Sequence, residues 1–134
     1  MPLIGPVKIK AQVLCGPDCA MGPGKADLLE AIAREGSISA GCRALGMSYR
    51  RAWMLVDTMN RCWTEPLVET KPGGGEDRGA RLTARGVEVL AAFRGLERSL
   101  ADAVAGHSYE VLLGRLRAEP LPHADTARSS TAPV

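Results

Sequence analysis

Apolar residues recur with helical periodicity through two neighbouring segments in the middle of the chain. In residues 37–45 they are spaced for one helix face, at Ile38, Cys42 and Leu45. In residues 48–63 one face gathers Ala52, Leu55, Val56, Met59 and Trp63, and the opposite face gathers Arg50, Met54, Asp57 and Arg61. Ser37 and Ser48 precede these segments as N-caps, and Gly46 between them permits the positive φ that ends a helix. The pattern predicts two short helices joined by a tight turn, a helix-turn-helix.

The segments before this unit predict one strand and one helix. Residues 7–14 alternate apolar and polar side chains, which indicates a half-buried strand, and residues 15–18 end it in a Gly-Pro turn. Residues 25–34 show helical spacing, and Gly36 ends that helix. Its predicted buried face consists of Leu28, Leu29, Ile32 and Ala33.

A hairpin is predicted directly after the unit. Pro66 breaks the second helix, and residues 67–71 and 80–82 fit two short strands. The glycine-rich residues 73–79 form the tip between them. A hairpin at this place is the arrangement called a wing.

A long helix follows the hairpin. Thr83 caps it, and it runs to about residue 105 with an apolar stripe at Val87, Leu90, Ala91, Leu96, Leu100 and Val104. Gly106 interrupts it, and a second amphipathic helix carries Tyr109, Val111, Leu112, Leu113 and Leu116. A domain this small covers the long stripe only in part, and the strand at residues 7–14 lacks a partner, so we expect a homodimer.

The expected fold is mainly α with a small β component: a winged helix-turn-helix with a long C-terminal dimerisation helix. Residues 1–22 form an N-terminal strand and turn, and residues 23–118 form the winged helix-turn-helix with its dimerisation helices. Residues 119–134 are rich in Pro, Ala, Ser and Thr, which predicts a disordered tail.

Composition narrows the class of protein. The 134 residues are 46% hydrophobic and 24% charged, as in ordinary globular proteins, and the net charge of +2 is weak. Between Arg43 and Arg85, however, eight Lys/Arg face five Asp/Glu, so the basic bias lies at the predicted helix-turn-helix. No membrane span, signal peptide or catalytic motif is recognisable, which predicts a cytoplasmic protein that is not an enzyme and needs no cofactor.

The candidate partner is double-stranded DNA. Two arginines in the first turn of a helix oppose its macrodipole, which indicates a use other than stability. One of them, Arg50, is suited to reading a guanine and Met54 to contacting a thymine methyl, while Ser48 is first of all a cap. Tyr49 either contacts a phosphate or packs its ring, and Asp57 is placed to orient Arg61 or Arg50. The predicted contacts are Ser48, Tyr49, Arg50, Arg51, Met54, Lys71, Arg78 and Arg81.

The thiols offer the main alternative chemistry. Cys15 and Cys19 are spaced like half of a zinc knuckle, but no second ligand pair follows. We therefore expect no metal site. The default is four free thiols, with Cys15 and Cys19 as a candidate redox pair.

Together these residues resemble the N-terminal DNA-binding domain of the ModE family of molybdate-responsive transcription regulators. The resemblance covers roughly residues 7–100 and rests on Gly36-Ser37-Ile38-Ser39, Ser48-Tyr49-Arg50-Arg51-Ala52-Trp53, Met59-Asn60, Leu67-Val68-Glu69 and Arg81-Leu82-Thr83. It implies a dimeric winged helix-turn-helix that binds a palindromic operator and is linked to molybdenum uptake or molybdoenzyme genes.

One departure from the family concerns its C-terminal molybdate-binding modules. Only about 30 residues follow the long helix, so the chain resembles a stand-alone form that is not expected to bind molybdate alone. The alternatives are a LysR- or MarR-like winged-helix regulator with another effector, an interaction module that has lost DNA binding, and a thiol- or metal-binding module.

Overall fold

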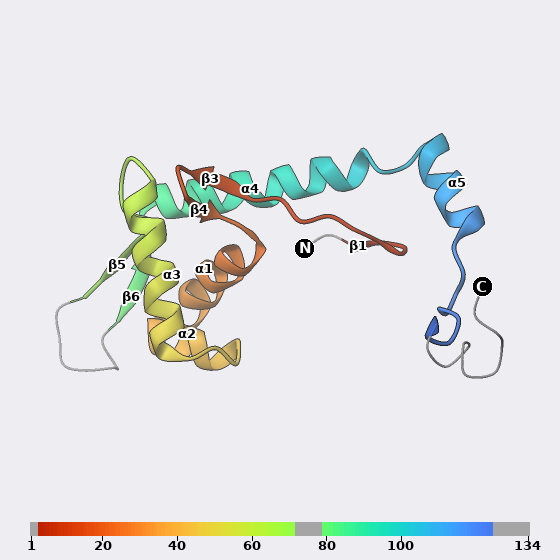
Figure 1. Ribbon diagram of the computed structural model, residues 1–134. Coiled ribbons are helices and arrows are strands. Elements are labelled where there is room, and N and C mark those ends of the chain that lie inside the picture. The colour runs from red at the N-terminus through yellow and green to blue at the C-terminus, as the bar shows by residue number, and fades with distance from the viewer. Residues whose placement is uncertain (1–2, 72–78, 125–134) are drawn as a thin grey trace. The chain divides into compact units, whose positions relative to one another are not determined.

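The computed structural model describes residues 3–71 and 79–124, which are mainly helical with short antiparallel strands (Figure 1). The order is β1 (Leu3–Ile4), β2 (Val7–Lys8), β3 (Val13–Cys15), β4 (Asp18–Met21), α1 (Pro23–Glu35), α2 (Ile38–Ala44), α3 (Tyr49–Cys62), β5 (Val68–Thr70), β6 (Ala80–Leu82), α4 (Ala84–Asp102) and α5 (His107–Arg115). The chain divides into two units, Met1–Val104 and Ala105–Val134. The first contains every element except α5.

The two predicted central helices form with the predicted caps. The Ser37 hydroxyl accepts a hydrogen bond from the Ala40 N–H at 3.0 Å, and the Ser48 hydroxyl accepts one from the Arg51 N–H at 3.1 Å. Gly46 lies between the helices with φ of +67°. These contacts are local in sequence, which explains why the pattern located α2 and α3 correctly.

The core lies between α1, α2 and α3. It buries Leu28, Leu29, Ile32, Ile38, Cys42, Ala52, Val56 and Met59. The prediction that Ala33 belongs to it is wrong, because Ala33 is exposed and Ala31 is buried. A Cβ on Gly41 of α2 would lie 3.2 Å from the Ile32 nitrogen and 3.4 Å from the Ala31 carbonyl carbon, so α2 covers that side of α1.

The predicted hairpin is present as β5 and β6, which pair Val68 with Leu82 and Thr70 with Ala80. Asn60 of α3 anchors its first strand: the side-chain oxygen accepts from the N–H groups of Leu67 and Val68 at 2.9 and 3.1 Å, and its NH₂ donates to the Val68 carbonyl at 3.0 Å. The other strand joins the start of α2, where the Ala80 N–H donates to the Gly36 carbonyl at 2.9 Å. Of the predicted tip, residues 73–78, with Arg78, lie outside the described residues.

The single strand predicted at residues 7–14 is wrong. Two hairpins stand there instead: β1 with β2, and β3 with β4. Glycines with φ of +57° turn both of them, at Gly5 and Gly16, and the register shifts between Val13 and Leu14. Alternation reports which side chains face a core, but it does not specify the pairing partner. Because these strands pair within the chain, they give no argument for a dimer.

The long helix α4 begins at the predicted cap, where Thr83 accepts from the Gly86 N–H at 3.0 Å and donates to the Pro66 carbonyl at 2.6 Å. It ends at Asp102, slightly before the predicted end. Arg94 ties it to α1 through two carboxylates, Asp27 at 2.6 Å and Glu30 at 2.7 Å, and also pairs with Glu97 of α4 itself at 2.9 Å. The predicted apolar stripe is only partly covered: Val87 is 57% and Leu96 43% exposed.

The second unit contains the predicted last helix, α5, after Gly106. None of its residues is buried. Within residues 3–71 and 79–124, none of the helices combines the length and apolarity needed to span a bilayer.

Candidate nucleic-acid interface

The first turn of α3 presents two arginines to solvent. Arg50 and Arg51 are both exposed, and neither forms an ion pair with the described residues. Their position at a helix N-terminus is electrostatically unfavourable because the helix dipole is positive there. Two uncompensated cations at this place therefore favour binding of an anion.

Tyr49 packs its ring against a neighbour in the same helix. The ring centroids of Tyr49 and Trp53 are 6.2 Å apart at an interplanar angle of 78°, an edge-to-face contact. Trp53 is half-buried against the core, while Tyr49 remains 37% exposed. The ring-packing interpretation of Tyr49 is thus part of the structure, and its exposed fraction remains accessible to a ligand.

The outward face of α3 continues with Met54 and an ion pair. Met54 is 59% exposed. Asp57 accepts a hydrogen bond from the Arg61 guanidinium at 2.9 Å, and this contact raises the pKa of Arg61. Of the two arginines considered for Asp57, the structure selects Arg61 and leaves Arg50 uncompensated.

The hairpin places its basic residues differently. Lys71 is exposed, and its backbone N–H donates to the Gly79 carbonyl at 2.8 Å, which extends the strand pairing beyond Thr70 and Ala80. Arg81 lies directly across from Glu69 in the strand register and pairs with it at 2.5 Å. Its charge is therefore partly compensated, unlike that of the arginines on α3.

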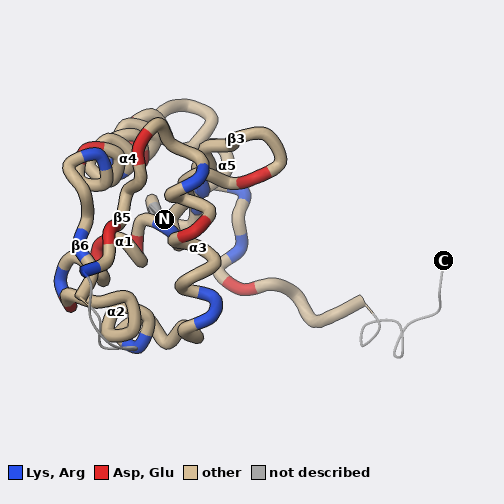
Figure 2. The backbone as a smooth tube through the Cα atoms, turned by 90° about the vertical axis from the view of Figure 1, so that its left-hand side faces the viewer, with Lys and Arg blue, Asp and Glu red and all other residues tan. Residues whose placement is uncertain are grey.

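Other basic residues lie near these elements without having been singled out from sequence. Figure 2 shows Lys and Arg positions beside α2 and along β6. Arg43 in the last turn of α2 is exposed and forms no ion pair with the described residues. Lys10 and Lys25 line one hollow together with Arg51, although the three belong to different segments. No local signal reveals that convergence, because it depends on how β3, α1 and α3 pack.

The thiols do not form a metal site. All four are free, and residues 3–71 and 79–124 contain no group of three or more His, Cys, Asp or Glu able to hold an ion. Cys19 donates to the Met21 carbonyl at 3.2 Å. Desolvation, and then the hydrogen-bonding neighbour Cys15, raise the pKa of Cys62. Folding thus gives Cys15 a thiol neighbour on α3 that sequence spacing did not indicate.

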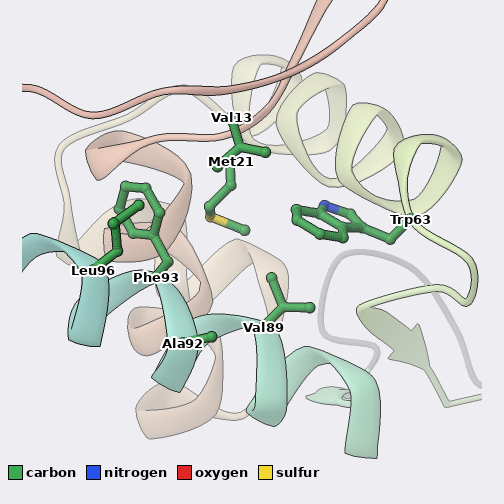
Figure 3. Close-up of a pocket in the computed structure, with 7 residues that line it drawn as sticks. All are labelled: Val13, Met21, Trp63, Val89, Ala92, Phe93 and Leu96. Carbon is green, nitrogen blue, oxygen red and sulfur yellow. The ribbon is translucent and has the colours of Figure 1, made fainter.

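An apolar pocket of about 170 Å³ lies between the β3–β4 hairpin, the end of α3 and α4 (Figure 3). Its lining residues are Val13, Met21, Trp63, Val89, Ala92, Phe93 and Leu96. The Trp63 indole N–H is already bonded to the Ala20 carbonyl at 3.1 Å. The pocket therefore offers surface for apolar contact and no donors for an oxyanion.

Comparison with known proteins places the chain in a family. No protein-family model matches it. A molybdenum transport protein ModE from Azotobacter vinelandii is 38% identical over 107 residues, which are 77% of this chain and 40% of that protein. The molybdenum-pterin-binding protein MopB from Rhodobacter capsulatus is 41% identical over 101 residues, 75% of this chain and 37% of that protein. The DNA-binding transcriptional dual regulator ModE of Escherichia coli K12 is 40% identical over 68 residues, 51% of this chain and 26% of that protein.

The chain belongs to the ModE family. The resemblance seen in the sequence is thereby confirmed. The matches span two fifths or less of these relatives, so this ModE-family chain corresponds to one part of them. Their names describe a transport protein, a molybdenum-pterin-binding protein and a transcription regulator.

Proposed function

We propose that this ModE-family chain is a DNA-binding transcription regulator. In this proposal α2 and α3 form a helix-turn-helix, α3 enters the major groove, and the β5–β6 hairpin is a wing along the backbone or minor groove. The observation that carries it is the exposed, uncompensated pair Arg50 and Arg51 at the start of an outward helix face.

Each candidate residue takes one role in the proposal. Arg50 reads a base edge, since no carboxylate holds it, and Met54 contacts a thymine methyl. The remaining residues bind phosphates, Ser48 through the backbone amides that follow it, and so supply most of the affinity. These are Ser48, Tyr49, Arg51, Lys71, Arg78 and Arg81.

A homodimer is part of the proposal. The exposed Val87 and Leu96 on α4, together with the apolar pocket beside them, form a surface that a second copy covers. A two-fold dimer sets its two reading helices about one turn of DNA apart, ~34 Å, and requires a palindromic site. Sedimentation at micromolar concentration is expected to show a dimer; a strictly monomeric profile contradicts this.

The operators proposed for this chain lie at genes of molybdenum uptake or molybdoenzymes. The protein is proposed to act in the cytoplasm. The support is the naming of the relatives as a molybdenum transport protein and a DNA-binding regulator.

Titration of a fluorescent duplex with the protein tests the proposed function. We expect binding that weakens steeply as salt rises, because cations released from the backbone drive association. The double variant Arg50→Ala, Arg51→Ala is expected to lose most of the affinity for the duplex. Arg34→Ala, whose arginine pairs with Glu35 on α1, serves as the control and should bind like the wild type. The proposal fails if the wild-type protein leaves the duplex free at low salt.

A further inference from the structure

A hollow of about 160 Å³ lies beside the first turn of α3 and opens to solvent. Three cations line it, each from a different segment: Lys10 before β3, Lys25 near the start of α1, and Arg51 in the first turn of α3. Gln12 adds an amide to the same wall. The tertiary fold thus brings three positive charges to one small volume.

Nothing in the described part of the chain compensates these charges. No carboxylate lines the hollow, and Lys10, Lys25 and Arg51 take part in no ion pair with the described residues. Other arginines of the same unit, such as Arg61 and Arg94, do pair with carboxylates. Like charges converging without a counter-charge repel one another, and an anion between them relieves that repulsion.

The neutral part of the wall also admits an anion. Gly22, Pro23 and Gly24 line it, and a Cβ at Gly24 would meet nothing within 4 Å. No side chain caps α1 and Pro23 has no N–H, so the donors that its first turn adds next to the three cations are the N–H groups of Gly24 and Lys25. The backbone is therefore open to close approach where the charges converge.

We propose that this hollow binds a tetrahedral oxyanion, and that the oxyanion is a phosphate of the DNA backbone beside the groove that α3 reads. The inference rests on the proposed function. Arg51 connects the hollow with the proposed DNA-reading face, because it lines the hollow and shares the first turn of α3 with Arg50. A solvent-open hollow whose cations are exposed or half-buried holds a free ion weakly, whereas a phosphate tethered in DNA is held by every other contact as well.

The test uses Lys10→Gln, Lys25→Gln and their combination, because these residues were not among the contacts that define the proposed function. The control is Arg98→Gln, which removes one positive charge, as each single variant does, from an exposed position on α4. Affinity for a duplex of random sequence is measured by fluorescence anisotropy across a range of KCl concentrations. Circular dichroism verifies that each variant is folded.

We expect the double variant to lose about one unit of slope in log affinity against log salt, and roughly eightfold in affinity near 0.1 M salt, with Arg98→Gln unchanged. A double variant with the wild-type slope overturns the inference while leaving the proposed function intact. A wild-type protein that does not bind duplex overturns both.

A second arm identifies the source of the oxyanion. Amide spectra of the labelled protein are recorded with duplex, with inorganic phosphate and with molybdate. The Gly24 and Lys25 signals are expected to shift with duplex and not to saturate with either free ion at matched concentrations. Saturation by phosphate or molybdate at micromolar levels would instead make the hollow a small-ion site and overturn the assignment to DNA.

Discussion

At the scale of single residues, compensation of charge separates structural arginines from candidate ligand-binding ones. Arg94 contacts three carboxylates and is only 19% exposed, so its role is to join α1 to α4. Arg81 has one exposed partner, Glu69, so its charge is compensated less than that of Arg94. Arg50 has no ion-pair partner among the described residues, which fits a side chain reserved for a ligand.

The two classes of DNA contact predict different losses. Arg50→Ala is expected to cost about 1–3 kcal/mol at one base position and to relax the preferred sequence there. Arg81→Ala is expected to weaken binding to all sequences, because it removes a phosphate contact and uncovers Glu69, and to lower the salt slope by about one unit. Competition among single-base operator variants measures the sequence preference, and titration at several salt concentrations measures the slope. An unchanged sequence preference in Arg50→Ala contradicts the proposed docking.

Arg94 carries the prediction for stability. Arg94→Met keeps helix propensity and bulk but leaves the buried Glu97 carboxylate without this partner, so urea unfolding should show a loss of about 1–3 kcal/mol. Arg61→Met, which breaks an exposed pair, should lose much less stability, because solvent screens exposed ion pairs. Equal effects of the two substitutions would contradict this.

The same cluster sets a pH dependence. The hydrogen bond from Arg94 lowers the pKa of Glu30. Because the pKa of Glu30 is lower in the folded than in the unfolded chain, its ionised form stabilises the fold at pH values above the usual glutamate pKa. That stabilisation is lost as the pH falls through the folded-state pKa. The difference in unfolding free energy between wild type and Arg94→Met should therefore become smaller as the pH falls. A difference that stays constant with pH would show that Glu30 and Arg94 are not coupled in this way.

At the scale of elements, sequence located what local contacts determine. Ser37, Ser48 and Thr83 cap their helices through the third residue after each, so the helix starts were predictable. The pattern predicted one strand at residues 7–14 and missed the return strand β4, and it placed Ala33 in the core where packing of α2 buries Ala31. The convergence of Lys10 and Lys25 on α3 was unpredictable because it depends on tertiary contacts.

Close packing of α4 against the segment before β5 gives a matched pair of glycines. A Cβ at Gly86 would lie 2.1 Å from the Leu67 carbonyl oxygen, whereas one at Gly95 would meet only the Arg98 side chain at 3.7 Å. Gly95→Ala should stabilise by about 0.5–1 kcal/mol through helix propensity. Gly86→Ala should instead destabilise by about 1–3 kcal/mol, because backbone must move. Thermal unfolding of the two variants measures these changes in stability. A Gly86→Ala variant more stable than the wild type would contradict the close contact between Gly86 and Leu67.

At the scale of the whole molecule, two pockets among the described residues bear on molybdate. One is lined entirely by apolar side chains, and the other is the open hollow that we propose to hold a tethered phosphate. The helix α5 buries none of its residues. A ligand shifts a DNA-binding equilibrium only through different affinities for two states, and we propose that the described residues offer molybdate no site that couples to DNA binding.

Molybdate is accordingly expected neither to bind these 134 residues stoichiometrically nor to alter their affinity for DNA. Isothermal titration calorimetry with and without duplex measures both. Micromolar stoichiometric binding coupled to changed DNA affinity would reveal a site formed elsewhere, such as at the dimer interface.

Selection of bound sequences from a random duplex pool tests the central claim most directly, because it reports DNA recognition and molecular symmetry together. A dimeric reader with α3 in the major groove predicts an enriched palindrome whose half-sites are centred about 10 base pairs apart. A pool that shows no enrichment, or that yields a single half-site without its symmetric copy, would contradict the claim.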